Sequence, residues 1–116
     1  MDFGDYEGKR AEDLYGLAPY KAYLASGGKT PFPGGEDMEA FRERTLAAFD
    51  RLTRRWQADA CADGPLALVC HGGTIMALFS ARCTEKKAYF SWHVAPGRGY
   101  KALLRDDGSL QLTGEI

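Results

Sequence analysis

Apolar side chains recur at steps of three and four residues through the middle of the chain, which is the periodicity of an amphipathic helix. The stripe consists of Met38, Phe41, Thr45, Ala48, Phe49, Leu52 and Trp56. Asp37 precedes this stripe and is a residue type that caps helix amino ends. We therefore predict one long helix over residues 37–57, with Trp56 in the core.

The sequence before this helix is rich in glycine and proline. A helical turn or two is predicted over Arg10–Tyr15, ended by Gly16. Pro19 is suited to the first turn of a second short helix that reaches Leu24. The glycines and prolines of residues 26–35 predict an ordered loop, in which Phe32 is the apolar anchor.

After the long helix, the apolar positions become continuous. Leu66–Cys70 reads Leu-Ala-Leu-Val-Cys, which predicts a short strand buried on both faces of a parallel sheet. A second helix is predicted to start near Thr74. Residues 100–105 and 110–116 predict two strands, because the intervening Asp106–Ser109 segment has the composition of a hairpin turn.

Composition narrows the classes of protein. The chain has 116 residues, 45% of them hydrophobic, and its 15 Lys+Arg and 16 Asp+Glu give a formal net charge of −1. This length suits a single domain over residues 1–116. The balanced charge argues against nucleic-acid or membrane-surface binding. Cys61, Cys70 and Cys83 are odd in number and lack CxxC spacing, and no apolar leader is visible, so we expect a cytoplasmic protein with reduced thiols.

The best candidate for chemistry is the junction between the predicted strand and the second helix. His71 would lie at the carboxyl end of the strand, and Gly72 and Gly73 let a ligand approach the backbone closely. The following helix offers unpaired N–H groups to an anion, so a phosphate suits this arrangement, with His71 as hydrogen-bond or proton donor. The structural alternative is that the glycines form a tight turn and His71 only caps or packs.

Other chemistries are less well supported. A lipase-type site needs a G-x-S-x-G sequence, which is absent. Cys70 and His71 are neighbours on a strand and would point to opposite faces, so Cys70 is predicted to be core rather than a nucleophile. The histidines and cysteines lack zinc-ligand spacing, so no metal site is expected. His93 is predicted to be packed or partly exposed, and Arg42 and Arg44 to be solvated on a helix face.

Three motifs carry a resemblance to a known family. They are Phe3–Gly8 (Phe-Gly-Asp-Tyr-Glu-Gly), Pro33–Glu36 followed by Phe41 and Arg44, and Val69–Thr74 (Val-Cys-His-Gly-Gly-Thr). In this order they resemble the histidine phosphatase superfamily. The branch is the phosphoglycerate mutase-like one, which includes α-ribazole phosphatases.

The resemblance implies a three-layer α/β/α fold and hydrolysis or transfer of a phosphoryl group through a phosphohistidine, without metal or other cofactor. The ligand would be phosphate or a small phosphorylated substrate. His71 matches the second histidine of the family, and Gly72, followed by Gly73, matches the backbone N–H that contacts phosphate. Glu7 and Glu36 are the acidic residues that we expect near the pocket. The loops of residues 26–35 and 89–98 are expected to set the substrate specificity, and no residue in either loop identifies a particular phosphate ester.

The sequence departs from the family pattern at its amino end. It contains no Arg-His-Gly motif for the nucleophilic histidine, and the acid and arginines of the family would precede Met1. We therefore expect a fold that is incomplete at the amino-terminal end, and an inactive or weak enzyme. One alternative is a non-catalytic relative that binds a phosphorylated ligand or a partner chain, and another is phosphorylation of His71 itself. An unpaired sheet edge would favour a homodimer.

Overall fold

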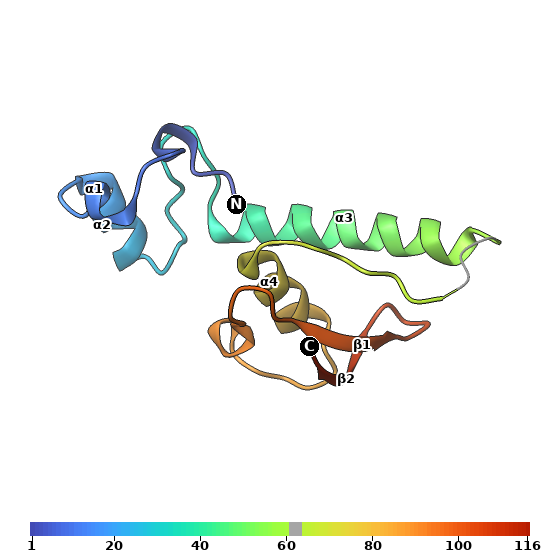
Figure 1. The fold of residues 1–116 in the computed structure, drawn as a ribbon. Helices are drawn as coiled ribbons and strands as arrows, with labels where there is room; N and C mark the ends of the chain where they lie inside the picture. The colour runs from blue at the N-terminus through green and yellow to red at the C-terminus, as the bar shows by residue number, and fades with distance from the viewer. Residues whose placement is uncertain (61–63) are drawn as a thin grey trace. The chain divides into compact units, whose positions relative to one another are not determined.

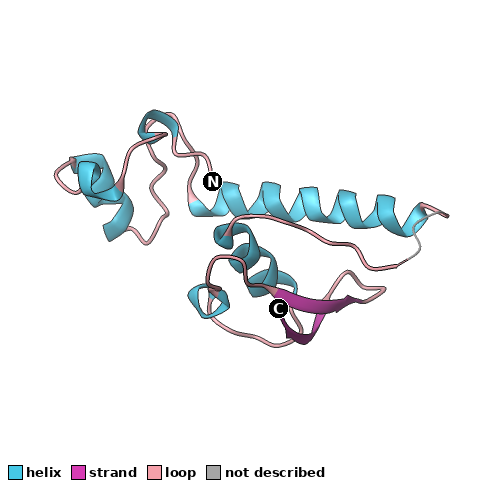
Figure 2. Cartoon of the chain, viewed as in Figure 1, coloured by secondary structure: helices cyan, strands magenta, loops and turns pink. Residues whose placement is uncertain are grey.

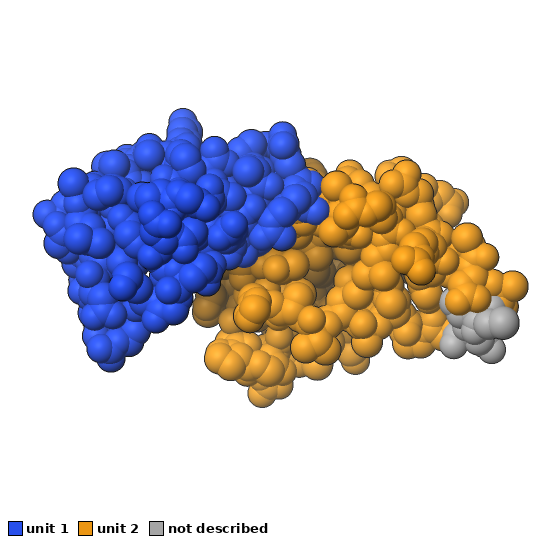
Figure 3. Space-filling view, turned by 90° about the horizontal axis from the view of Figure 1, so that it is seen from above, with its two compact units in different colours: residues 1–44 blue, residues 45–116 orange. Residues whose placement is uncertain are grey.

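The computed structural model describes residues 1–60 and 64–116, which form two compact units. Unit 1 comprises Met1–Arg44 and unit 2 comprises Thr45–Ile116 (Figure 3). Cys61 lies outside the described residues. The grouping of the chain into a single domain stays a prediction, and we describe each unit by itself.

Unit 1 begins with a 3-10 helix, η1, over Gly4–Tyr6. Two short helices follow, α1 over Ala11–Leu14 and α2 over Ala18–Ala25 (Figure 1). These helices confirm the two short helices that the sequence predicts. Pro19 lies in the first turn of α2, where a residue without an N–H group breaks no hydrogen bond of the helix.

The core of unit 1 is aromatic. Phe32 is 3% exposed, and its ring centroid lies 4.0 Å from that of Tyr23 in a stacked arrangement. The ring of Tyr6 meets Phe32 edge-on at 5.7 Å. These contacts confirm Phe32 as the anchor of the loop, because one large apolar side chain can hold a glycine-rich segment that has no regular structure.

The long helix α3 spans Met38–Ala58, and Asp37 caps it by accepting the Ala40 N–H at 2.8 Å. Its buried residues recur every fourth position, namely Phe41, Thr45, Phe49 and Thr53. Leu52 is 41% exposed, Ala48 is exposed and Trp56 is only half-buried. The prediction of the helix is confirmed, but the prediction that Trp56 belongs to the core is wrong, because the rest of the chain covers a face of the helix that is narrower than the apolar stripe. Thr53 is tolerated there because its hydroxyl donates to the Phe49 carbonyl at 3.0 Å.

Unit 2 packs the carboxyl-terminal elements around one apolar cluster. Helix α4 covers Gly72–Arg82, the 3-10 helix η2 covers Tyr89–Trp92, and the strands β1 and β2 cover Tyr100–Leu104 and Leu110–Glu115. The strands form the predicted antiparallel hairpin (Figure 2). The hairpin pairs Leu104 with Leu110 and has a register shift between Lys101 and Ala102. The cluster contains Phe49, Leu78, Phe79, Cys83, Trp92 and Leu110.

The predicted buried strand at Leu66–Cys70 is wrong. The segment is drawn as a loop that leads into α4 (Figure 2), and within the described residues none of its backbone groups is hydrogen-bonded to the chain. Val69 is 101% exposed, and Cys70 is exposed rather than core. The physical reason is that a strand needs a neighbour, and within the described residues the sheet holds only β1 and β2, with one isolated bridge between Cys83 and Leu110.

The combination of helices with a small antiparallel sheet confirms the predicted α/β class in its incomplete form, because the described residues hold a single two-stranded sheet instead of a full central layer. No helix in the described part of the chain is both long and apolar enough to cross a membrane. The candidate site of residues 71–73 lies at the start of α4.

Candidate functional site

The amino end of α4 is built by the backbone of His71. This residue has the extended conformation of a helix cap, with φ −70° and ψ 154°. Its carbonyl accepts the Thr74 N–H at 2.9 Å and the Ile75 N–H at 3.2 Å. The helix therefore begins at Gly72, two residues before the predicted start, and Gly72 and Gly73 form its first turn. Their N–H groups have no acceptor within the helix, as is general for first-turn amides.

This helix end has the properties of an anion-binding surface. The helix dipole places partial positive charge at Gly72 and Gly73. A Cβ atom at Gly72 would meet nothing within 4 Å, so the backbone there is open to a ligand. The side chain of His71 is exposed and makes no capping hydrogen bond. The glycines thus form a helical turn rather than a separate tight turn, and His71 caps the helix through its backbone while its imidazole stays exposed.

Tyr89 is a neighbour of this site that the sequence did not identify. Its hydroxyl Oη donates to the Gly73 carbonyl at 3.3 Å, which joins η2 to the first turn of α4. The sequence offered one weak signal, since residues 89–98 were expected to lie over the pocket. The aromatic run has no helical or strand periodicity, however, and could not indicate which ring would face α4.

Cys70 immediately precedes the site, and its chemistry argues against a thiol nucleophile. The neighbouring chain partly desolvates the sulfur, which raises the pKa of Cys70 even though the residue as a whole is exposed. A raised pKa keeps the thiol protonated near neutral pH and therefore weakly nucleophilic. Among the described residues, no group of three or more His, Cys, Asp and Glu side chains is arranged to hold a metal ion.

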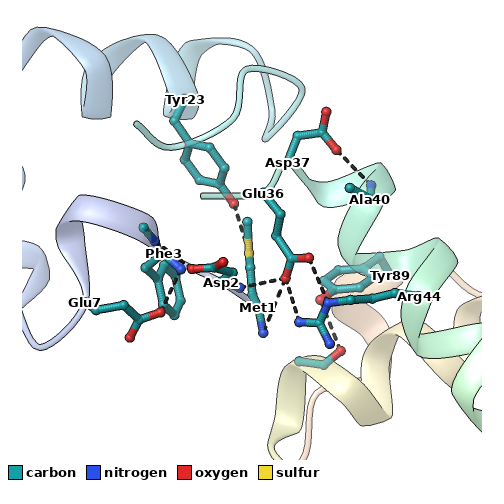
Figure 4. A network of polar contacts seen from close by, with 12 residues as sticks. Met1, Asp2, Phe3, Glu7, Tyr23, Glu36, Asp37, Ala40, Arg44 and Tyr89 are labelled. Atoms are coloured by element: carbon teal, nitrogen blue, oxygen red, sulfur yellow. Dashed lines mark hydrogen bonds and ion pairs between the residues drawn. The ribbon is translucent and has the colours of Figure 1, made fainter. Parts of the chain in front are cut away.

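Glu36 is the centre of a polar network in unit 1 (Figure 4). Its carboxylate accepts two hydrogen bonds from the Arg44 guanidinium, from Nε at 2.8 Å and from Nη2 at 2.7 Å. It also accepts the Asp2 N–H at 2.6 Å. The hydrogen bonds from Arg44 are the main reason that the pKa of Glu36 is lowered. The Arg44 side chain is 58% exposed, as expected of a solvated residue, and it also forms a bidentate ion pair with Glu36.

Glu7 has a local structural contact. Its carboxylate accepts the Phe3 N–H at 2.8 Å and so closes the turn of η1. Glu7 and Glu36 thus both lie in unit 1 and bind backbone N–H groups near the amino end, whereas His71, Gly72 and Gly73 lie together at one helix end in unit 2. The roles of these five residues in a pocket stay predictions.

Among the clefts in the described part of unit 2 are two that His71 does not line. One of about 240 Å³ lies between α3, the end of α4 and the hairpin turn, and Arg54, Arg82 and Arg105 are among its lining residues. The other, of about 440 Å³, is lined by His93 and Arg98. The start of α4 is therefore an open surface rather than part of these clefts.

Comparison with known protein families gives a match that spans the three sequence motifs. A family model described as the histidine phosphatase superfamily (branch 1) matches residues 1–113. The match covers both units and includes the Val69–Thr74 motif at the start of α4. No curated protein and no solved structure gives a significant match to the chain.

Proposed function

Because the chain belongs to the histidine phosphatase superfamily, whose activity is phosphatase- or mutase-type phosphoryl transfer, we propose that it binds a phosphate monoester at the amino end of α4. One observation carries the proposal: His71 caps a helix whose first two residues are glycines, with an exposed imidazole and an open backbone. The same few residues therefore offer two N–H donors, a positive helix end and a titratable ring to one anion.

Each group has a defined role in the proposed complex. The Gly72 and Gly73 N–H groups donate to two phosphate oxygens, because glycine leaves no side chain between the ligand and the backbone. The imidazole of His71 donates a hydrogen bond to a third oxygen and stabilises the negative charge that grows on the phosphoryl group during transfer. Tyr89 holds the Gly73 carbonyl and thereby fixes the first turn.

Turnover by this chain alone is proposed to be weak. In the family that the sequence resembles, transfer needs a nucleophilic histidine in an Arg-His-Gly motif, and the chain has none. His93 is the one other histidine in the sequence, and it lines a cleft that does not include His71. This observation favours a second candidate function, namely binding of a phosphorylated ligand without turnover.

Calorimetric titration of the full chain with inorganic phosphate and with phenyl phosphate tests the binding proposal. His71→Ala should weaken binding about tenfold, the worth of a charge-assisted hydrogen bond of ~1.5 kcal/mol. His93→Ala is the matched control and should bind as the natural chain does. Equal affinity of the natural chain and His71→Ala would contradict the proposal.

A turnover assay separates the two candidate functions. Release of p-nitrophenol from p-nitrophenyl phosphate that disappears in His71→Ala and persists in His93→Ala would support phosphoryl transfer. Binding without release would support the non-catalytic function. Release that survives His71→Ala would exclude His71 from the reaction.

A further inference from the structure

The first turn of α4 is open because it begins with two glycines, and the same feature gives it little order of its own. Gly72 and Gly73 carry no side chain that could pack against the rest of unit 2. Glycine loses more backbone entropy than any other residue when it becomes helical. Helix ends also fray, because their first N–H groups have no acceptor within the helix. A turn of two glycines at a helix end therefore needs an outside contact to stay helical.

The 3-10 helix η2 supplies such a contact from its first residue. Tyr89 is half-buried, and its Oη donates to the Gly73 carbonyl at 3.3 Å. A carbonyl oxygen has two lone pairs, so it can accept this hydroxyl in addition to an N–H of the next helical turn. The contact is long for an O–H···O hydrogen bond, which places its strength at the low end of the usual range. It therefore favours the helical form of the first turn without locking it.

The last residue of η2 anchors this short helix in the core of unit 2. Trp92 is 0% exposed, and its ring centroid lies 5.2 Å from that of Phe79 on α4 and 5.5 Å from that of Tyr100 on β1. Side chains three positions apart in a 3-10 helix eclipse each other, so Tyr89 and Trp92 leave the same face of η2. That face contacts α4 twice, at Gly73 and at Phe79. The packing of Trp92 therefore determines where the Tyr89 hydroxyl lies.

We propose that η2 regulates the affinity of the phosphate site. While Trp92 is packed in the core, Tyr89 holds the first turn of α4 in the conformation that presents the Gly72 and Gly73 N–H groups together. When the Tyr89 contact opens, this turn frays, and the apparent affinity is reduced in proportion to the fraction of molecules in which the turn is formed. Tyr89 is thus a positioning residue, since it acts on a ligand only through Gly73. The effect on affinity rests on the proposed phosphate site, whereas the effect on the turn does not.

Amide hydrogen exchange of the full chain tests the effect on the turn without any ligand. The Thr74 and Ile75 N–H groups report on the first turn, because both donate to the His71 carbonyl. Tyr89→Phe keeps the ring and removes the hydroxyl, so it should speed the exchange of these two amides about two- to fivefold, which corresponds to ~0.5–1 kcal/mol. Tyr100→Phe is the matched control, since its hydroxyl makes no hydrogen bond within the described residues, and it should leave both exchange rates unchanged.

Calorimetric titration of the same variants with inorganic phosphate tests the effect on affinity. Tyr89→Phe should weaken binding by about twofold or more, up to the factor by which it speeds exchange, and Tyr100→Phe should bind as the natural chain does. Equal exchange in Tyr89→Phe and the natural chain, equally fast exchange in Tyr100→Phe, or faster exchange in Tyr89→Phe with an unchanged affinity would overturn the proposal. Faster exchange in Tyr89→Phe, in a chain that binds no phosphate, would refute the phosphate site and support the role of η2 in ordering the turn.

Discussion

Replacement of Trp92 by alanine should remove most of the stability of unit 2. Trp92 is 0% exposed and is the largest fully buried side chain described. Its ring lies 5.2 Å from Phe79 on α4 and meets Tyr100 on β1 edge-on at 5.5 Å, and the Lys87 amine lies 4.7 Å from its centroid. One side chain thus connects η2, α4 and the hairpin.

The size of the effect follows from these contacts. Truncation of a buried tryptophan to alanine costs about 3–5 kcal/mol, and each lost aromatic pair adds ~0.5–1.5 kcal/mol. We therefore expect Trp92→Ala to lower the free energy of unfolding by about 4 kcal/mol or more, a large share of the ~5–15 kcal/mol typical of a domain. Trp92→Phe should cost only about 1 kcal/mol, because it keeps a ring. The Trp92 Nε1 donor is buried without a partner among the described residues, so its removal breaks no hydrogen bond there.

Urea unfolding followed by far-ultraviolet circular dichroism measures both values without tryptophan fluorescence. Trp56→Phe is the control, since Trp56 is half-buried on α3, and it should change the stability by less than ~1 kcal/mol. The reasoning is refuted if Trp92→Ala costs less than about 1.5 kcal/mol, or if Trp92→Phe costs as much as Trp92→Ala.

Two further predictions concern unit 1 and are checked by thermal unfolding. Glu36→Gln should lower stability by about 1 kcal/mol near neutral pH. Because the pKa of Glu36 is lowered in the folded protein, its stabilisation is fully present above the unfolded pKa of ~4.3 and is lost as the pH falls through the folded pKa. The difference in stability between the natural chain and Glu36→Gln should therefore shrink in acid, and a difference that grows in acid would contradict this prediction. Gly4→Ala should cost more than ~2 kcal/mol, since a Cβ would lie 2.2 Å from the Pro33 oxygen at φ +54°. Gly8→Ala, at φ +74° in open space, should cost about 1 kcal/mol, and equal losses would refute the steric argument.

The elements that the sequence predicted well depend on local signals. Helix α3 follows from apolar periodicity and the Asp37 cap, and the hairpin follows from two β-favouring runs around Asp106–Ser109. The motif at Val69–Thr74 also identified the helix end at His71, because a pair of glycines that follows an apolar run is likewise a signal from neighbouring residues. Such features need no knowledge of the rest of the fold.

The features that sequence reasoning missed depend on distant partners. The apolar run Leu66–Cys70 has the composition of a buried strand, but burial requires neighbouring strands that no local pattern supplies. The ion pair of Glu36 with Arg44 joins a loop residue to a helix residue eight positions later, a spacing without a regular periodicity. The contact of Tyr89 with Gly73 depends on how η2 packs. Trp92 is the residue of η2 that is buried in the core and so holds this helix in place.

The most direct test of the phosphate site is the nuclear magnetic resonance of the backbone amides at the start of α4. The full ¹⁵N-labelled chain would be titrated with inorganic phosphate, with the amide of Gly16, which lies in the turn after α1, as an internal reference. The account predicts saturable shifts of the Gly72 and Gly73 amides and a Gly16 amide that does not move. Unchanged Gly72 and Gly73 amides, or equal shifts of all three, would contradict it.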